Sequence, residues 1–171
     1  SSSFVSFDSS TSSVLLVRDV AGDYRQVDAD EVLQAAQLVL LGRVRGSDVL
    51  ASPQAVRDFL RIKLGTLEHE MFAVVHLDTQ NRVIEYVEMF RGTVSQTSVY
   101  PREVVRESMM RNSAALLLVH NHPSGSTQPS RADEMLTQTL KTALALVDVR
   151  VLDHLIVAGN DILSMAECGR L

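Results

Sequence analysis

The pattern of hydrophobic and polar positions predicts that strands and helices alternate over most of the chain. Short runs rich in apolar, β-branched and aromatic residues favour strands, and apolar positions that recur at helical spacing favour helices. Strands are predicted at 14–20, 71–78, 83–90, 92–99 and 114–120, with a closing hairpin around Gly159 and Asn160. Helices are predicted from Asp30 to Gly42, from Ser52 to Leu64, over 101–112 and from Ser130. This order predicts an α/β sandwich with a mixed β-sheet.

Two of the predicted helices carry more detailed expectations. The first is expected to be amphipathic, with its apolar face formed by Val32, Leu33, Ala36, Leu38, Val39 and Leu40. The second is expected to begin with Ser52 as the N-cap and Pro53 at the first helical position. We divide the chain into a lead-in (1–13), an N-terminal strand and helical part (14–49) and a main domain (50–171).

Composition narrows the class of protein. The chain has 171 residues, 46% hydrophobic and 22% charged, which is typical of a single soluble globular domain. It contains neither a secretory leader nor a long apolar segment, so we expect a cytoplasmic protein without a membrane contact. A net charge of -5 does not support nucleic-acid binding. A single cysteine, Cys168, excludes both an internal disulfide framework and a cysteine-based zinc site.

Two histidines at the end of the predicted buried strand are candidate metal ligands. His120 and His122 are two residues apart, so in an extended backbone their side chains point to the same face. Pro123 ends the regular strand, and a polar loop leads to a helix with Asp133 in its first turn. Two imidazoles and one carboxylate suit zinc and leave one tetrahedral position for water. The pattern therefore predicts a catalytic zinc ion, which would activate that water.

Simpler interpretations of the same residues remain open. Ser130 and Asp133 fit a capping box, in which both side chains only close the first turn of the helix. A His-x-His pair is also common on protein surfaces without a metal. A zinc nucleobase deaminase is excluded, because its Pro-Cys-x-x-Cys element cannot be built with one cysteine.

The string HNHPSGSTQPSRAD, together with GTVSQTSVYPREVV before it and VLDHLIVAG after it, closely resembles the RadC family, a bacterial branch of the JAB/MPN/JAMM metalloprotease superfamily. The resemblance covers about 50–171. It implies a mixed sheet between helices, as in the JAB/MPN and cytidine-deaminase-like sandwich, and a zinc-dependent peptidase or isopeptidase. Longer RadC proteins carry a helix-hairpin-helix region, and we find none ahead of Leu50. The resemblance therefore gives little support for a role of this chain in DNA repair.

The resemblance also assigns roles to individual residues. It makes His120, His122 and Asp133 the ligands of one zinc ion, and it makes Ser130 a hydrogen-bond donor to the oxyanion or the bound water. The general base is a glutamate before the first core strand, which corresponds to Glu70. Glu68 is the alternative to Glu70. Glu85 and Glu88, on the next strand, are expected to face solvent.

Other polar residues near the motif are expected to be structural. Asn121 lies between the two ligands and should point to the opposite face, where a hydrogen bond is its expected role. His154 is interpreted as a core histidine rather than a fourth ligand, which would occupy the position that water needs. His69 and His76 have no partner at ligand spacing.

The leading functional hypothesis is hydrolysis of an amide bond in a peptide or protein substrate. A non-catalytic MPN binding module and a DNA-associated accessory protein are the alternatives. Substrate specificity would depend on the loops at 91–100 and 124–129. The substrate and the oligomeric state remain open.

Overall fold

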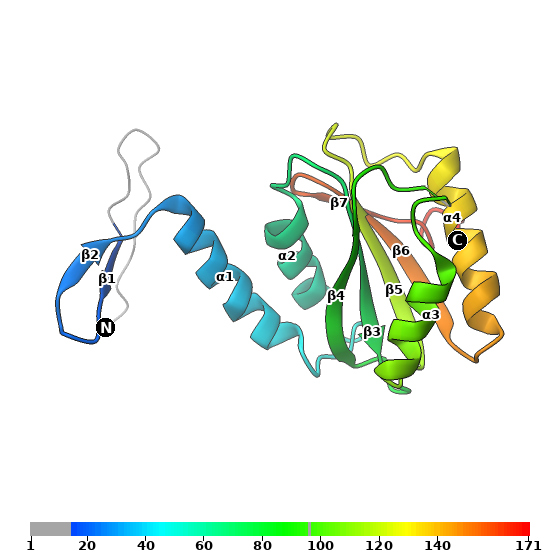
Figure 1. Cartoon of the computed structure of the whole chain (residues 1–171), viewed down its shortest axis with the longest axis horizontal. Helices are drawn as coiled ribbons and strands as arrows, with labels where there is room; N and C mark the ends of the chain where they lie inside the picture. Colours follow the sequence, from blue (N-terminus) through cyan, green and yellow to red (C-terminus); the bar gives the residue numbers. More distant parts are fainter. Residues whose placement is uncertain (1–14, 96) are drawn as a thin grey trace.

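A mixed five-stranded β-sheet forms the centre of the molecule (Figure 1). The computed structural model describes residues 15–95 and 97–171. Along the sheet the strands follow the order β4-β3-β5-β6-β7, in which β5 and β6 are parallel and the other neighbours are antiparallel. The strands are β3 (Met71–Leu77), β4 (Val83–Arg91), β5 (Ala115–Asn121), β6 (Arg150–Ala158) and β7 (Asp161–Ser164). The predicted mixed sheet is confirmed.

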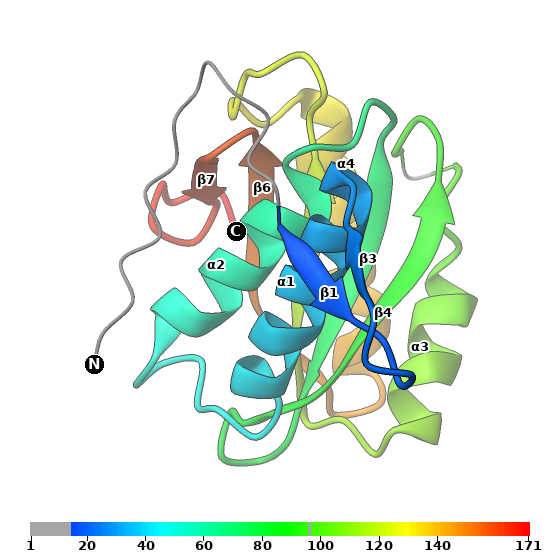
Figure 2. The ribbon, with the colours of Figure 1, turned by 90° about the vertical axis from the view of Figure 1, so that its left-hand side faces the viewer.

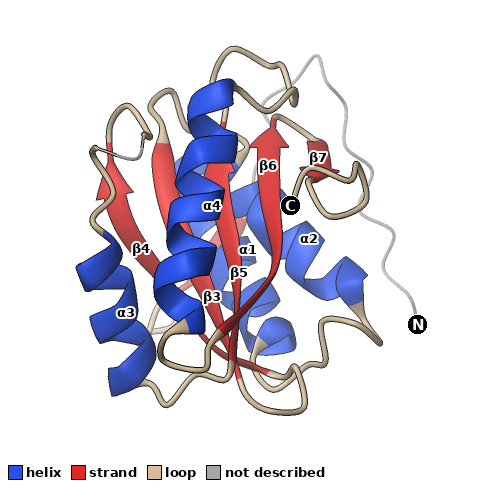
Figure 3. Ribbon diagram, turned by 90° about the vertical axis from the view of Figure 1, so that its right-hand side faces the viewer, coloured by secondary structure: helices blue, strands red, loops and turns tan. Residues whose placement is uncertain are grey.

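Helices cover both faces of this sheet and make the molecule a three-layer sandwich (Figure 3). Helices α3 (Pro101–Met110) and α4 (Arg131–Ala145) lie on one face, and α2 (Pro53–Leu64) lies on the other. Each face has its own apolar cluster of buried side chains. Because both faces are covered, the central strand β5 is buried along its whole length, which explains its continuous apolar sequence.

The alternation of side chains along β5 decides where the chemistry-bearing residues point. Leu117 and Val119 pack in the cluster beneath α2, whereas Leu116 and Leu118 pack in the cluster beneath α3 and α4. By the same two-residue period, His120 belongs to the α4 face. The strand thus aims His120 at the helix that carries Asp133.

The N-terminal part extends away from the sheet on one side (Figure 1), and Figure 2 views the molecule from that side. It consists of a two-stranded hairpin, β1 (Leu16–Arg18) and β2 (Tyr24–Gln26), followed by α1 (Ala29–Val44). Asp28 caps α1, and its carboxylate accepts from the Glu31 N–H. The expectation of an amphipathic helix with a buried face was wrong, because Leu38 and Val39 are 71% and 58% exposed and only Val44 of α1 is buried. The sequence pattern could not show that α1 packs against α2 and reaches the apolar core cluster only through Leu40, Leu41 and Val44.

One local prediction was also wrong. The predicted strand at 92–99 is a series of turns over its described residues. Gly92 has a φ of 129°, and the Ser98 hydroxyl accepts from the Ser95 N–H and donates to the Thr93 carbonyl, which bends the backbone away from a strand. The predicted start of α2 was confirmed, because Ser52 is the N-cap and Pro53 opens the helix, although the Ser52 side chain makes no capping hydrogen bond.

The remaining predicted elements were confirmed. β3 and β4 form the expected antiparallel hairpin, and β6 and β7 form the closing hairpin around Gly159 and Asn160. The lead-in at 1–13 lies outside the described residues. Within the described part of the chain, no helix has the length and apolar character needed to cross a bilayer.

Candidate metal centre

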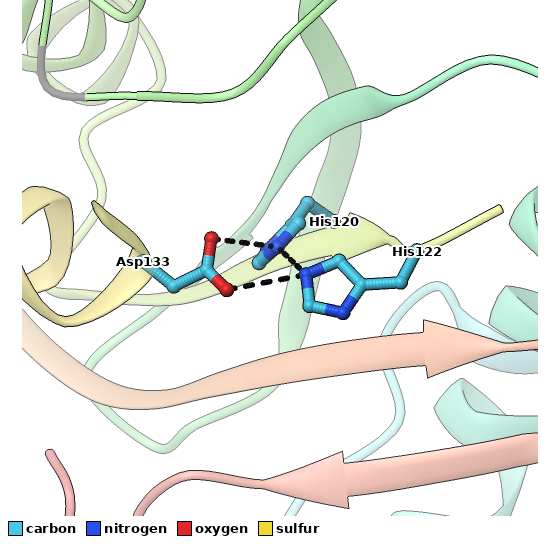
Figure 4. A group of neighbouring side chains, drawn as sticks. All are labelled: His120, His122 and Asp133. Atoms are coloured by element: carbon cyan, nitrogen blue, oxygen red, sulfur yellow. Dashed lines mark hydrogen bonds and ion pairs between the residues drawn. The ribbon is translucent and has the colours of Figure 1, made fainter. Parts of the chain in front are cut away.

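The candidate ligands meet where β5 ends and α4 begins (Figure 4). His120 is the penultimate residue of β5, and His122 follows the strand, where its main-chain N–H still donates to the Val157 carbonyl of β6. Asp133 is the third residue of α4. The crossover from β5 through α4 to the parallel strand β6 therefore brings the three side chains together at the carboxyl end of the central strands, a common place for ligand sites in α/β folds.

Three side chains present one potential ligand atom each, and these atoms lie within 4.8 Å of one another. The Nε2 atoms of His120 and His122 are 2.8 Å apart. Nε2 of His120 lies 3.1 Å from Oδ1 of Asp133, and Nε2 of His122 lies 3.1 Å from Oδ2. His120 and Asp133 are buried, and His122 is half-buried, so the group opens to solvent on the side of His122.

The donor chemistry of this group fits a cation. Nδ1 of His122 lies 2.8 Å from the Ser126 carbonyl oxygen. Because a carbonyl oxygen only accepts, Nδ1 is the N–H donor, and Nε2 of the neutral ring carries a lone pair directed at His120 and Asp133. A buried lone pair next to a carboxylate requires a positive partner, either a proton or a metal ion. The group can therefore hold a metal ion.

Asp133 has two structural tasks at once. Its Oδ2 accepts from the Ser130 N–H at 2.7 Å, and the Ser130 hydroxyl oxygen accepts from the Asp133 N–H at 3.1 Å. The capping box is thus present, and it does not compete with metal binding, because both carboxylate oxygens still face the histidines. Although burial alone would raise the pKa of Asp133, the hydrogen bonds and charge that the His120 and His122 rings supply when protonated hold it below its usual value, which keeps the carboxylate ionised.

The same electrostatics act on His122. Its hydrogen bond to Asp133 raises the pKa of the ring, burial opposes this effect, and the charge of Glu70 adds to it.

The sheet register explains how Glu70 comes close to the histidines. Phe72 of β3 is paired with His120 of β5 in an antiparallel ladder. Continuing the ladder by two residues brings Glu70 opposite His122 on the same face. The following loop holds Glu70 at two points, because Gly92 N–H donates to its carbonyl at 2.9 Å and Val94 N–H donates to Oε2 at 2.7 Å.

Glu68 and Ser130 differ from Glu70 in their surroundings. Glu68 is exposed, whereas Glu70 is half-buried. Ser130 is exposed at the N-terminus of α4, three residues before Asp133. Since Oγ of Ser130 already accepts from the Asp133 N–H, the hydroxyl can donate its hydrogen toward the site. Glu70 is thus the less exposed of the two candidate bases, and Ser130 lies at the start of the helix that carries Asp133.

Asn121 makes the structural hydrogen bonds expected of it. Its side chain points away from the histidines, accepts from the Met71 N–H at 2.7 Å and donates to the His69 carbonyl at 2.9 Å. These bonds fix the backbone on both sides of Glu70. The prediction was confirmed, and the positioning of Glu70 is a consequence that the sequence did not reveal.

The remaining histidines lie outside the ligand group. His76 is buried, and its Nδ1 is 2.7 Å from the Ser113 hydroxyl. His154 is fully buried in the core, where burial lowers its pKa well below the usual value, so the ring is neutral. Its Nε2 lies 2.8 Å from Nδ1 of His120 and its Nδ1 lies 2.6 Å from the Thr137 hydroxyl. Sequence reasoning missed Thr137, although it follows Asp133 by one helical turn.

Glu85 and Glu88 form ion pairs at the edge of the sheet. Glu85 lies 3.0 Å from Arg45, and Glu88 lies 3.5 Å from Lys63. Glu88 is exposed and Glu85 is half-buried, so a surface role agrees with the prediction most clearly for Glu88.

The mixed sheet between helices, with a metal-competent group at the end of its central strand, defines a JAB-type α/β domain. A family model described as "RadC-like JAB domain" matches residues 50–170, and the chain belongs to this family. A UPF0758 protein from Leptothrix cholodnii is 54% identical over 150 residues, which cover 88% of this chain and 68% of the relative. One from an Acidovorax species is 56% identical over 148 residues, which cover 86% and 62%. The chain thus spans about two thirds of the length of these relatives.

Proposed function

We propose that the protein is a zinc-dependent hydrolase of the JAMM type that cleaves an amide bond in a peptide or protein substrate. The observation that carries the proposal is the convergence of His120, His122 and Asp133 with ligand atoms within 4.8 Å, opposite a half-buried glutamate. Two imidazoles and one carboxylate form the donor set of many catalytic zinc sites. Membership in the RadC-like JAB domain family supports the same chemistry.

Zinc held by these three side chains would lower the pKa of a water molecule and polarise the substrate carbonyl. Glu70 then acts as the general base. Val94 N–H holds Oε2 of its carboxylate, which leaves Oε1 to take a proton as the water oxygen attacks the carbonyl carbon. Glu70 passes this proton to the amide nitrogen, the C–N bond breaks, and the products are a carboxylic acid and an amine.

Ser130 is proposed to stabilise the negative charge that develops on the substrate oxygen. Its oxygen is held by the Asp133 N–H, so the hydroxyl group is fixed at the start of α4 while its hydrogen can be donated. The positive end of the α4 dipole lies at the same place and favours the same charge.

Two measurements test this proposal. Zinc content is determined by elemental analysis in the wild type and in His122→Ala, and we expect close to one ion per chain in the wild type and a large loss in the variant. Hydrolysis of a peptide library is then followed with and without a chelator. Equally low zinc in both proteins would overturn the metal site.

Zinc binding without any chelator-sensitive hydrolysis would instead favour the alternative of a binding module with a structural ion. A DNA-associated role predicts a salt-dependent mobility shift with duplex DNA, whereas the net charge of -5 predicts none under the same conditions.

A further inference from the structure

We propose that Thr137 and His154 are positioning residues that fix the tautomer of His120, so that its Nε2 lone pair faces the metal ion. This inference rests on the metal site of the proposed function and adds two residues that contact neither ion nor substrate. It follows from the direction of three consecutive hydrogen bonds, which begin in α4, pass through β6 and end in β5.

The direction of the first bond is set by a main-chain carbonyl. The Thr137 hydroxyl donates to the Asp133 carbonyl oxygen at 2.7 Å, one helical turn earlier. A hydroxyl has one hydrogen, so toward His154 the Thr137 oxygen can only accept. Nδ1 of His154, 2.6 Å away, is therefore the N–H donor.

The second step follows from the chemistry of a neutral imidazole. When one ring nitrogen carries the hydrogen, the other carries a lone pair. Nε2 of His154 is thus an acceptor, and its neighbour at 2.8 Å, Nδ1 of His120, is the donor. His154 is fully buried, and the ring of Phe72 meets it edge to face at a centroid distance of 6.3 Å, surroundings that favour an uncharged ring.

The consequence is that Nε2 of His120 carries a lone pair directed at His122 and Asp133. Nε2 of His122 also carries a lone pair, for an independent reason: Nδ1 of that ring donates its hydrogen to the Ser126 carbonyl. Each ligand histidine therefore has its Nδ1 hydrogen bound to a protein acceptor. The two Nε2 atoms lie 2.8 Å apart, so their lone pairs point into one space that needs a proton or a metal ion. Second partners of this kind orient ligand histidines in metalloproteins.

This series of three hydrogen bonds, here called the relay, also excludes His154 as a ligand. Both of its ring nitrogens are engaged, one by Thr137 and one by His120. Asp133 contributes to the site in two ways. Its carboxylate faces the two ligand histidines, and its main-chain carbonyl accepts the Thr137 hydrogen bond with which the series begins. The first two turns of α4 therefore supply one ligand, Asp133, and also the Thr137 hydroxyl that fixes the tautomer of a second ligand, His120.

The critical variant is Thr137→Val, which keeps the shape of the side chain and removes the hydroxyl. His154 then loses the acceptor for its Nδ1 hydrogen and can carry this hydrogen on Nε2 instead. Nε2 of His154 would then donate to Nδ1 of His120, which favours the tautomer of His120 with its hydrogen on Nε2. That tautomer cannot bind a metal. Zinc affinity, measured by competition with a chromophoric chelator, is expected to fall about 10- to 100-fold. Thr137→Ser keeps the hydroxyl and should restore most of the affinity.

A spectroscopic readout separates positioning from a general structural defect. Long-range ¹H–¹⁵N spectra of the metal-free protein at pH 8 should show His120 protonated at Nδ1 in the wild type and in Thr137→Ser. In Thr137→Val the signal should shift toward the Nε2–H form. His154→Gln can still accept from His120 and donate to Thr137, so it should retain more zinc affinity than His154→Phe.

The outcomes distinguish the two proposals. If the wild type binds no zinc, the proposed function fails. If it binds zinc and Thr137→Val keeps both the wild-type affinity and the Nδ1–H tautomer, the relay is overturned while the metal site stands. Thermal unfolding of each metal-free variant tests whether that variant is folded. If Thr137→Val does not fold, the tautomers of the wild type and the comparison of His154→Gln with His154→Phe decide the question.

Discussion

The Asn121 side chain accepts a hydrogen bond from the Met71 main-chain N–H at 2.7 Å and joins the strand of the two histidines to the strand that follows Glu70. A residue between two candidate ligands thus fixes the candidate base from the opposite face of the sheet. The metal group and the glutamate are therefore parts of one rigid arrangement across β3 and β5.

Removing the Asn121 hydrogen bonds should disturb the position of Glu70 more than it weakens metal binding. In Asn121→Ala, the partly buried Met71 N–H and His69 carbonyl lose their partner, so the free energy of unfolding should fall by about 1 to 3 kcal/mol. Hydrolysis should fall further than zinc affinity, because the backbone around Glu70 is freed. Denaturant unfolding, chelator competition and peptide hydrolysis measure the three effects. The exposed amide variant Gln80→Ala is the control and should change stability by less than about 0.5 kcal/mol.

Glu70→Gln should separate chemistry from metal binding. The amide preserves the size of the side chain but cannot take a proton, so the hydrolytic rate should fall about 100- to 10,000-fold with zinc content unchanged. Glu68→Gln is the matched control, because Glu68 is exposed two residues earlier. Similar rates for wild type and Glu70→Gln, with a loss in Glu68→Gln, would assign the base to Glu68.

Ser130 combines a helix cap with a proposed catalytic hydroxyl, and two variants separate these tasks. Ser130→Ala should cost about 1 kcal/mol of stability, whereas Ser130→Gly should cost only a few tenths, because glycine is tolerated at an N-cap. Both remove the hydroxyl, so both should lower the hydrolytic rate by about 100- to 1,000-fold. If Ser130→Gly hydrolyses peptides as fast as the wild type, Ser130 serves only as a cap.

His76 should make stability depend on pH. Burial first, and then the charge of Arg111, lowers its pKa from 6.5 to about 4 in the folded protein. Since the unfolded chain binds this proton more readily, the contribution is present above pH 6.5 and is lost as pH falls from 6.5 toward 4.

Between pH 7 and pH 4.5, the titration of His76 should lower the free energy of unfolding by about 2 kcal/mol. His76→Asn retains a polar atom near Ser113 without this titration. Its stability, measured by denaturant unfolding with a chelator present, should therefore fall less over the same pH range. Equal pH dependence of the variant and the wild type would contradict the assignment.

The sequence by itself determined the features that depend on local periodicity and local chemistry. The apolar run before His120 predicts a strand covered on both faces, and the spacing of His120 and His122 places both on one side of it. The cap at Ser130 places Asp133 in the first helical turn. The family resemblance added Glu70, and the ladder between Phe72 and His120 supports its position.

Only the tertiary structure decided the relations between residues that are distant in the chain. Thr137 and His154 lie on different elements, and nothing in their local sequence indicates that Thr137 hydrogen-bonds His154 or that His154 hydrogen-bonds His120. Likewise, the apolar residues of α1 predict a buried face, yet burial depends on what the rest of the chain brings to them. Side-chain periodicity is a local property, whereas hydrogen-bond direction and burial depend on neighbours that only the packed fold supplies.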